Sequence, residues 1–517
     1  MSADELLNYA TELKLNAANL LDYTKVIELC KKAEAKGLSK ENQEFCKQLK
    51  VSTQIQRGLA ITQFFMQDDN ASTDALPKNW KVFRSMALMD LEAGADEAND
   101  IAAVQLAIGR LNMLPGGDLK KAKKALDTAI KNAADDPSVL VPSLKYRAEM
   151  ETNLHKIIAY LERAKKLAPD NTSLLEMFAR QWIKVKDYEK ALALIEEALK
   201  LNPENREYQK IKAYALVGLD RNEEAEKLFN KALEGSDKEN FLAVIERAEF
   251  YSSIGKRNEA IKLFSEMIAR VQVPGLYYFR AALYGQDKKF KEALNDLNQC
   301  LRIDPNFSEA LQLKGAIYLQ MEKYDDALKI FEDMLAKKPH DLNALSQVAY
   351  TYSKKGNFEK AKSILEKGLV EHADNIELLR SLGDACLMFG KWKETAENYD
   401  KILKIAPDDS GVLNNYAWML ATAPDSSVRN GKKALEMAKK AADLSWYKEA
   451  HILSTLGAAY AELGDFANAK KWSAEAVKFA EKEKHDRLAD LKAELESYKI
   501  KKPWREIPEG LKKPDQK

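Results

Sequence analysis

The 517-residue sequence has few of the residues that interrupt helices, with only 14 prolines and 21 glycines. Because a helix interior tolerates Pro and Gly least, this composition favours a protein built mainly of helix. Hydrophobic residues make up 46% of the chain, which is enough to form a continuous core and argues against extensive disorder. Composition therefore predicts a folded, helical protein.

The sequence also lacks a charge imbalance, closely spaced cysteines and a long apolar run. Lys and Arg number 81 against 80 Asp and Glu, so the net charge of +1 gives no general attraction to nucleic acid or to an anionic membrane. We expect the four scattered cysteines to be reduced and buried. The sequence has no run of about 18 apolar residues and no signal peptide. As given, it predicts a cytoplasmic protein without a membrane span, although an exported or periplasmic protein whose signal peptide had been removed would begin in the same way.

Motifs for catalysis and metal binding are missing as well. The five histidines are far apart, and the chain has no His-Glu-x-x-His, no Cys-x-x-Cys and no phosphate-binding or nucleophile motif. We therefore expect no catalytic residue, no metal site, no cofactor and no enzymatic activity. An RNA-binding helical solenoid would need a basic groove with regular base-reading positions, and neither is visible, so nucleic acid is not an expected partner.

A repeat of 34 residues organises most of the chain. Distances of 34, 102, 34 and 68 residues separate Pro169, Pro203, Pro305, Pro339 and Pro407. Small residues recur in step at two positions. The first series is Ala179, Ala213, Ala248, Ala281, Gly315, Ala349, Gly383, Ala417 and Gly457. The second is Ala191, Ala225, Ala260, Ala293, Ala327, Ala361, Ala434 and Ala469, with Thr395 as the exception. Two helices approach closely only where the facing side chains are small, so the pattern predicts repeated pairs of packed helices.

This pattern resembles the tetratricopeptide repeat (TPR), whose unit is two antiparallel helices. In residues 308–341 the consensus positions of that family hold Leu311, Gly315, Tyr318, Tyr324, Ala327, Phe331 and Pro339. The resemblance implies an all-α, right-handed TPR superhelical solenoid of antiparallel helix hairpins with a C-terminal capping helix. Residues 413–425 and 456–466 are also similar to segments of bacterial, planctomycete-type TPR proteins.

The strength of the repeat varies along the chain and predicts its domains. We expect divergent N-terminal helical hairpins in 1–100, two degenerate TPR-like units in 101–171, nine TPR units in 172–479, and a capping helix with a basic, partly docked tail in 480–517. A five-residue insertion near 421–433 predicts an extended hairpin loop, and residues 68–74 predict an exposed loop.

The resemblance also implies a concave groove lined by the first helix of each unit. Lys354 is at one of the groove positions, and the main partner-binding candidates at such positions are Tyr278, Gln312, Gln347, Tyr350, Arg380, Asp384, Asn414, Asn415 and Trp418. Amide side chains can hold the backbone of an extended peptide, while aromatic residues and Arg supply much of the contact energy. As alternatives, the three aromatic side chains could pack against neighbouring repeats, and Arg380 could pair with Glu377 or Asp384 on its own helix.

The expected function is a non-catalytic scaffold or adaptor that binds a protein or peptide segment in the concave groove. A structural subunit of a larger bacterial assembly, for example in the envelope, is the alternative; it would use its convex face or its ends, and self-association stays open. Two known TPR binding modes are not implied. Lys210 stands alone, with Tyr214 where a carboxylate clamp needs Asn, and only Asn415 occupies the position of an asparagine ladder.

Overall fold

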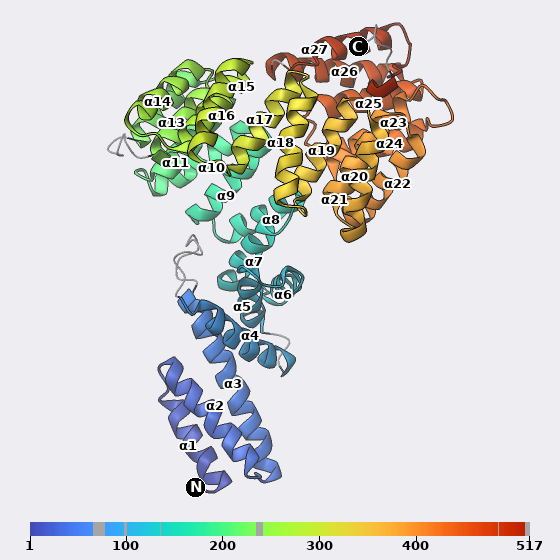
Figure 1. The fold of residues 1–517 in the computed structure, drawn as a ribbon. Helices are drawn as coiled ribbons and strands as arrows, with labels where there is room; N and C mark the ends of the chain where they lie inside the picture. The colour runs from blue at the N-terminus through green and yellow to red at the C-terminus, as the bar shows by residue number, and fades with distance from the viewer. Residues whose placement is uncertain (66–77, 98–100, 135, 234–240, 484, 512–517) are drawn as a thin grey trace. The chain divides into compact units, whose positions relative to one another are not determined.

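The computed structural model describes residues 1–65, 78–97, 101–134, 136–233, 241–483 and 485–511. In these ranges the regular elements are 27 α-helices and one short 3-10 helix, with no β-strand. Figure 1 shows the helices following one another as antiparallel pairs joined by turns. The all-α repeat architecture is thus confirmed. The loop expected at 68–74 and the end of the basic tail, 512–517, lie outside the described residues.

The chain forms two compact units, which are described separately. One unit comprises Met1–Gln181 and Ala193–Pro203, and the other comprises Trp182–Leu192 and Glu204–Lys517. Two consecutive helices therefore contribute to both units, α9 (Thr172–Lys184) and α10 (Tyr188–Leu201). The domain boundaries expected from the strength of the repeat stay predictions.

The first unit also contains eight complete helices. They are α1 (Ala3–Leu15), α2 (Leu20–Ala35), α3 (Lys40–Phe65), α4 (Trp80–Glu97), α5 (Ala102–Met113), α6 (Leu119–Asn132), α7 (Pro137–Glu149) and α8 (Leu154–Leu167). A buried ion pair joins α3 to α4: Arg57 Nε lies 2.7 Å and Arg57 Nη2 3.0 Å from the two carboxylate oxygens of Asp90. Both side chains are fully or almost fully buried, so this pair belongs to the core of the unit.

The second unit continues the helix pairs. Its first helices are α11 (Arg206–Gly218), α13 (Phe241–Ser253), α15 (Pro274–Gln286), α17 (Ser308–Gln320), α19 (Leu342–Lys354), α21 (Ile376–Met388), α23 (Ser410–Thr422) and α25 (Ala450–Glu462). Its second helices are α12 (Asn222–Ala232), α14 (Arg257–Arg270), α16 (Phe290–Ile303), α18 (Tyr324–Lys337), α20 (Phe358–Glu371), α22 (Trp392–Ile405), α24 (Gly431–Leu444) and α26 (Phe466–Glu483).

The small residues lie where the two helices of a pair cross. Every member of both series is buried, including Thr395 at the position of the exception. A Cβ atom added to Gly315 of α17 would lie 2.3 Å from the ring of Phe331 in α18, and one added to Gly383 of α21 would lie 2.6 Å from Tyr399 in α22. The recurring Gly or Ala is therefore a steric requirement of the crossing.

From α9 to α26, the turn within each pair except α23–α24, which carries the inserted residues, uses one residue in the left-handed region. These residues, which recur at about the repeat spacing, are Lys186, Asp220, Gly255, Lys288, Glu322, Gly356, Gly390 and Gly464. In the turn after α17, the amide of Glu322 donates to the carbonyl of Leu319 (3.0 Å) and that of Lys323 donates to the carbonyl of Tyr318 (2.8 Å). This pair of bonds satisfies carbonyls that the end of the helix leaves without partners.

The last helix, α27 (Leu488–Lys499), packs on α26 and covers the end of the array. Leu491 and Tyr498 of α27 are buried, in agreement with the expected capping helix. The chain then reverses, because Lys501 has φ 58° and the Lys502 amide donates to the Ser497 carbonyl (2.9 Å). Beyond this turn comes the stretch 503–511, which ends in the 3-10 helix η2 (Glu509–Leu511) and is called the 503–511 segment below.

Three further sequence expectations concern single features. All four cysteines are free and buried. The inserted residues lie between the end of α23 at Thr422 and the start of α24 at Gly431, where the Arg429 Nη1 donates to the Ala423 (2.8 Å) and Pro424 (3.0 Å) carbonyls. In the part of the chain that the structure describes, no helix combines the length and apolar character needed to cross a bilayer.

Candidate peptide-binding surface

The first helices of the second unit form a continuous surface. Neighbouring first helices touch one another, as α15 does with α17, α19 with α21, and α23 with α25. We name the side of α15, α17, α19, α21, α23 and α25 that is not packed on second helices the first-helix surface. All nine candidate residues belong to these helices: Tyr278 to α15, Gln312 to α17, Gln347 and Tyr350 to α19, Arg380 and Asp384 to α21, and Asn414, Asn415 and Trp418 to α23.

The candidates on α15, α17 and α19 are partly open to solvent. The Tyr278 ring lies 5.5 Å from the ring of Phe307 in the next repeat, and burial raises the pKa of its hydroxyl. Gln312 and Gln347 are partly exposed, whereas Tyr350 is 47% exposed. Tyr278 therefore contributes to packing between repeats, and Tyr350 is the more accessible aromatic side chain.

Arg380 connects two repeats. Its guanidinium pairs with Asp409, the residue that caps the N-terminus of α23, and one of the two contacts is an Nη1–Oδ1 distance of 3.2 Å. Asp409 also accepts from the amide of Val412 (3.0 Å). Burial opposes ionisation of Asp409, but Arg380 and this amide hold its pKa below the usual value. The partner of Arg380 is thus in the next repeat, and neither Glu377 nor Asp384 forms this ion pair.

A chain of polar side chains runs from α21 to α23. Asp384 accepts hydrogen bonds from the hydroxyl of Tyr399 and from Nδ2 of Asn415 (3.3 Å). Asn415 in turn accepts from Nδ2 of Asn414 (3.1 Å), whose own amide oxygen is buried and has no protein partner. Burial raises the pKa of Asp384. Three of the predicted residues therefore form one network, and the structure brings them into direct contact.

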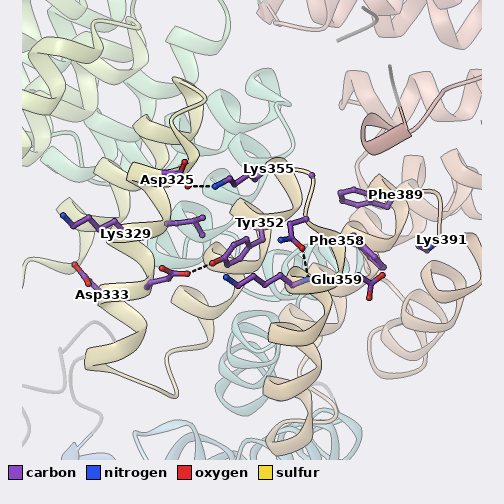
Figure 2. Close-up of a pocket in the computed structure, with 14 residues that line it drawn as sticks. Asp325, Lys329, Asp333, Tyr352, Lys355, Phe358, Glu359, Phe389 and Lys391 are labelled. Atoms are coloured by element: carbon purple, nitrogen blue, oxygen red, sulfur yellow. Dashed lines mark hydrogen bonds and ion pairs between the residues drawn. The ribbon is translucent and has the colours of Figure 1, made fainter. Parts of the chain in front are cut away.

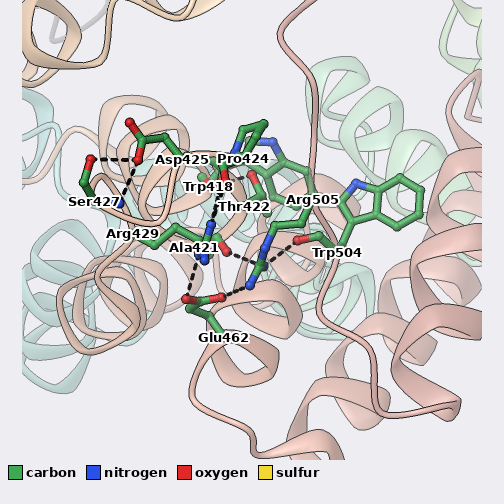
Figure 3. A network of polar contacts seen from close by, with 11 residues as sticks. Trp418, Ala421, Thr422, Pro424, Asp425, Ser427, Arg429, Glu462, Trp504 and Arg505 are labelled. Carbon is green, nitrogen blue, oxygen red and sulfur yellow. Dashed lines mark hydrogen bonds and ion pairs between the residues drawn. The ribbon is translucent and has the colours of Figure 1, made fainter.

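Trp418 faces the 503–511 segment (Figure 3). Its Nε1 donates to Oε2 of Glu506 at 2.6 Å, while its ring packs against the hydrophobic core around α23 and α25. Trp418 therefore packs within the array, which was the alternative expected from the sequence, and its contact with a partner peptide stays a prediction. Its contact is with a segment of the same chain.

The 503–511 segment crosses the C-terminal ends of four successive first helices. Arg505 pairs with Glu462 at the end of α25 and donates to the Ala421 carbonyl of α23 (3.2 Å). The Glu506 amide donates to the Thr422 carbonyl (3.1 Å). Gly510 lies against the end of α21, and Glu509 pairs with Lys354 at the end of α19 (2.6 Å). The sequence predicted a partly docked tail, with Trp504 and two prolines as its only signal, and did not indicate where the tail docks.

A pocket of about 280 Å³ remains between this segment and the first-helix surface. Its walls combine apolar side chains with a few polar groups, and they include Asp384, Met388, Trp392, Asn415, Trp418, Glu506 and Pro508. A mixture of apolar walls and a few directed polar groups is typical of a site that binds a side chain of a ligand. The predicted candidates Asp384, Asn415 and Trp418 thus share one cavity.

A larger, open depression of about 930 Å³ lies beside α18 and the start of α20, at the α19–α20 and α21–α22 turns (Figure 2). Its charged and polar side chains contact one another: Lys355 pairs with Asp325, and the hydroxyl of Tyr352 donates to Glu332 (2.7 Å). Lys360 lies 4.2 Å from the centre of the Tyr352 ring. No described group of three or more His, Cys, Asp and Glu residues is placed to hold a metal ion here or elsewhere in the described ranges.

Three family models match the chain. A model of the N-terminal TPR repeats region of Psidin covers residues 285–423, and two tetratricopeptide-repeat models cover residues 183–240 and 450–483. The matched residues coincide with the helix pairs, crossings and turns described above. The chain is a tetratricopeptide-repeat protein. The planctomycete-type bacterial resemblance expected from the sequence is not confirmed by these matches.

Individual relatives are more distant. The heat shock protein STI1 of Saccharomyces cerevisiae is 40% identical over 60 residues, and the match covers 11% of this chain and 10% of that protein. Yeast Tom70 aligns over 86% of this chain and 96% of its own, with 14% identity and a TM-score of 0.47. A tetratricopeptide repeat protein from Parabacteroides merdae aligns over 50% of this chain and 97% of its own, with 16% identity and a TM-score of 0.39. As a TPR protein, the chain has the stacked architecture of a protein-interaction scaffold.

Proposed function

We propose that this TPR protein is a non-catalytic adaptor that binds an extended peptide or a flexible partner segment on the first-helix surface between residues 274 and 425. The observation that carries the proposal is the 503–511 segment. An irregular stretch of polypeptide already lies on this surface, held by a tryptophan, a lysine and the carbonyls at the end of a first helix. A surface that holds such a segment within the chain has the groups needed to hold one from a partner.

The chemistry of the surface suits a peptide. Helix ends leave backbone carbonyls without intrahelical partners, and these can accept hydrogen bonds from any peptide amide. Tyr350 is an exposed aromatic residue, and Gln312 and Gln347 present amide groups beside it along the array. Tyrosine and tryptophan often dominate the energy of an interface, because they bury a large area with few rotatable bonds. We therefore place the strongest contacts of the partner at Tyr350 and Trp418.

Arg380 has a different role in the proposal from the one expected from the sequence. Its ion pair with Asp409 holds neighbouring repeats together, so a substitution at Arg380 would change the curvature of the surface as well as its charge. The residues best suited to testing peptide binding are therefore Gln347 and Tyr350, which carry no charge that could pair between repeats and are partly exposed.

The proposal can be tested by selecting peptides from a displayed random library on the full chain. Peptides that bind the wild type are then measured against Gln347→Ala/Tyr350→Ala by fluorescence anisotropy. We expect at least a tenfold loss of affinity, as is typical of removing an interface hot spot. Val370→Ala is the matched control, because Val370 is 83% exposed and lies on the second helix α20. Circular dichroism checks that both variants keep their helices.

The outcome that would contradict the proposal is equal binding to the wild type and to Gln347→Ala/Tyr350→Ala. Peptide binding that is lost in Val370→Ala instead would move the site to the convex side. Such a result would favour the alternative, a structural subunit that assembles through its convex face or ends. The apolar Leu15 and Leu21, which are 81% and 63% exposed in the first unit, would then be the next residues to examine.

A further inference from the structure

Three charged side chains of the 503–511 segment, those of Arg505, Glu506 and Glu509, each contact a polar group of the first-helix surface. Arg505 is received by Glu462 and by the carbonyl of Ala421. The carboxylate of Glu506 is received by the indole of Trp418. The carboxylate of Glu509 is received by Lys354. An arginine and two glutamates of one short stretch therefore each meet a group of opposite charge or a hydrogen-bond donor.

The receiving groups belong to three different repeats. Glu462 ends α25, Trp418 lies in α23, and Lys354 ends α19. Burial lowers the pKa of Lys354, but the hydrogen bond to Glu509 together with the electrostatic attraction of Glu509, Tyr350 and Tyr324 makes the net shift of this pKa upward. Glu462 also accepts from Nε of Arg429 (3.0 Å), so its carboxylate is fixed in position before Arg505 is added. These groups form a row of negative, neutral-donor and positive sites along the first-helix surface.

We propose that this row is a recognition site for an extended partner peptide with an arginine followed directly by one glutamate and, three positions later, by a second, and that the 503–511 segment occupies the site as a displaceable internal ligand. The inference rests on the proposed function, because it names the chemistry of the partner for the same surface. The molecule that we expect to occupy the site is a segment of a partner protein with the charge pattern of Arg505, Glu506 and Glu509.

The internal ligand is built to be displaced. None of the residues 501–510 is buried, and the ion pairs that hold the segment are partly exposed. Exposed ion pairs contribute little to stability, because water solvates the separated charges well. The segment occupies the site because these contacts, with the hydrogen bond from Trp418 to Glu506 among them, act on a stretch that the chain tethers there at an effective concentration of about a millimolar. A partner with the same charge pattern and additional contacts on Tyr350 would replace it.

Displacement has a measurable consequence. A site that is free for about one-tenth of the time binds an external ligand about tenfold more weakly than a site that is always free. Releasing the segment should therefore tighten the binding of an external peptide by about that factor. Full-length Glu506→Lys/Glu509→Lys should release it, because a lysine at position 506 then meets the indole N–H of Trp418 and a lysine at position 509 meets Lys354.

The experiment uses a fluorescent peptide with the wild-type sequence of residues 503–511. Its affinity is measured for the wild-type chain, for Glu506→Lys/Glu509→Lys, and for the latter with Lys354→Gln added. We expect about tenfold tighter binding to the released chain than to the wild type. Adding Lys354→Gln should weaken the binding of this peptide, because Glu509 of the peptide loses its cation, and should not change the binding of a peptide carrying Glu509→Gln. A peptide with Glu506→Gln and Glu509→Gln is the matched control and should bind weakly to every chain.

Failure of this inference can be told apart from failure of the proposed function. If the 503–511 peptide fails to bind the released chain while library peptides still depend on Tyr350, the charge pattern is wrong and the adaptor function stands. If the 503–511 peptide binds but no library peptide does, the surface serves only the internal segment and the proposed function fails. If wild-type chains form dimers that Glu506→Lys/Glu509→Lys abolishes, the occupant is a second copy of the chain, which overturns the commitment to a partner protein.

Discussion

Trp418 Nε1 lies 2.6 Å from Oε2 of Glu506, although 88 residues separate them in the chain. The indole is the one polar group of Trp418, and it would otherwise face the solvent on the first-helix surface. A hydrogen bond to a charged acceptor contributes about 1.5–3 kcal/mol, more than one between neutral groups. This contact is therefore a principal attachment of the 503–511 segment.

Trp418→Phe should loosen the segment while keeping an aromatic ring in the core. We expect the amide of Glu506, which donates to the Thr422 carbonyl, to exchange with solvent at least about tenfold faster, since a loss of 1.4 kcal/mol is a factor of ten. Hydrogen–deuterium exchange followed by mass spectrometry measures this. Trp472→Phe is the matched control. Trp472 lies in α26, one helix pair further along the array, and its ring stacks on that of Tyr447 with 5.2 Å between the ring centres. Unchanged exchange in Trp418→Phe would show that the hydrogen bond does not hold the segment.

The helix pairs were predictable because their cause is local. A crossing of two helices needs a small residue at a fixed place in every repeat, so the requirement appears in the sequence as Ala179, Ala213 and their equivalents. The helix surface that carries the candidate residues follows from the same period. The partners of the candidates were not predictable, since Arg380 meets Asp409 one repeat away and Trp418 of α23 meets Glu506 only after four further helices, α24 to α27. Such contacts depend on how several repeats stack and where the chain turns back, which local periodicity does not encode.

Gly315→Ala should destabilise the pair α17–α18. The new Cβ would lie 2.3 Å from the ring of Phe331, which is 1% exposed and has no free space to move into. Overpacking of this kind typically costs about 1–3 kcal/mol. Gly285→Ala in α15 is the matched control, because its Cβ would meet only Ile317 at 3.8 Å and Ala favours a helix by about 0.5–1 kcal/mol. Urea unfolding followed by circular dichroism should separate the two variants in opposite directions; equal midpoints would contradict the steric account.

The capping helix contains a buried carboxyl group. Glu494 of α27 is fully buried, and Oε2 accepts from the hydroxyl of Ser454 in α25 (2.5 Å) while Oε1 has no protein partner. Burial raises its pKa from 4.5 to about 7, with Glu506 and Asp490 adding to the shift and Arg487 opposing it. Tyr498 on the same helix is also buried, and its hydroxyl pKa is raised well above the usual value by burial first and by Glu494 second.

Docking of α27 should therefore weaken as the pH rises from about 4.5 to about 7. The folded state keeps the proton of Glu494 over this range and the unfolded state loses it, so the stabilisation is complete below pH 4.5 and is lost as the pH passes the folded pKa. The shift corresponds to roughly 3 kcal/mol. Hydrogen–deuterium exchange in α27, corrected for the intrinsic pH dependence of exchange, measures the effect. Glu494→Gln keeps a similar side chain without the titration, and a wild-type pH dependence that persists in this variant would assign the effect to another group.

The buried pair Arg57–Asp90 should be important for the stability of the first unit. Asp90 accepts from both Nε and Nη2 of Arg57, and Arg57 Nη1 also donates to Thr24 (3.0 Å), so the charges are paired and hydrogen-bonded inside the core. Asp90→Ala would leave the guanidinium buried without its partner, which typically costs about 3–5 kcal/mol. Removing both charges in Arg57→Met/Asp90→Ala should restore part of that loss, because no unpaired charge then remains. Unfolding midpoints should place the wild type first, the double variant second and Asp90→Ala last, and hydrogen–deuterium exchange in α3 and α4 should locate the change. A double variant less stable than Asp90→Ala would mean that the pair contributes more to stability than the burial of its charges costs.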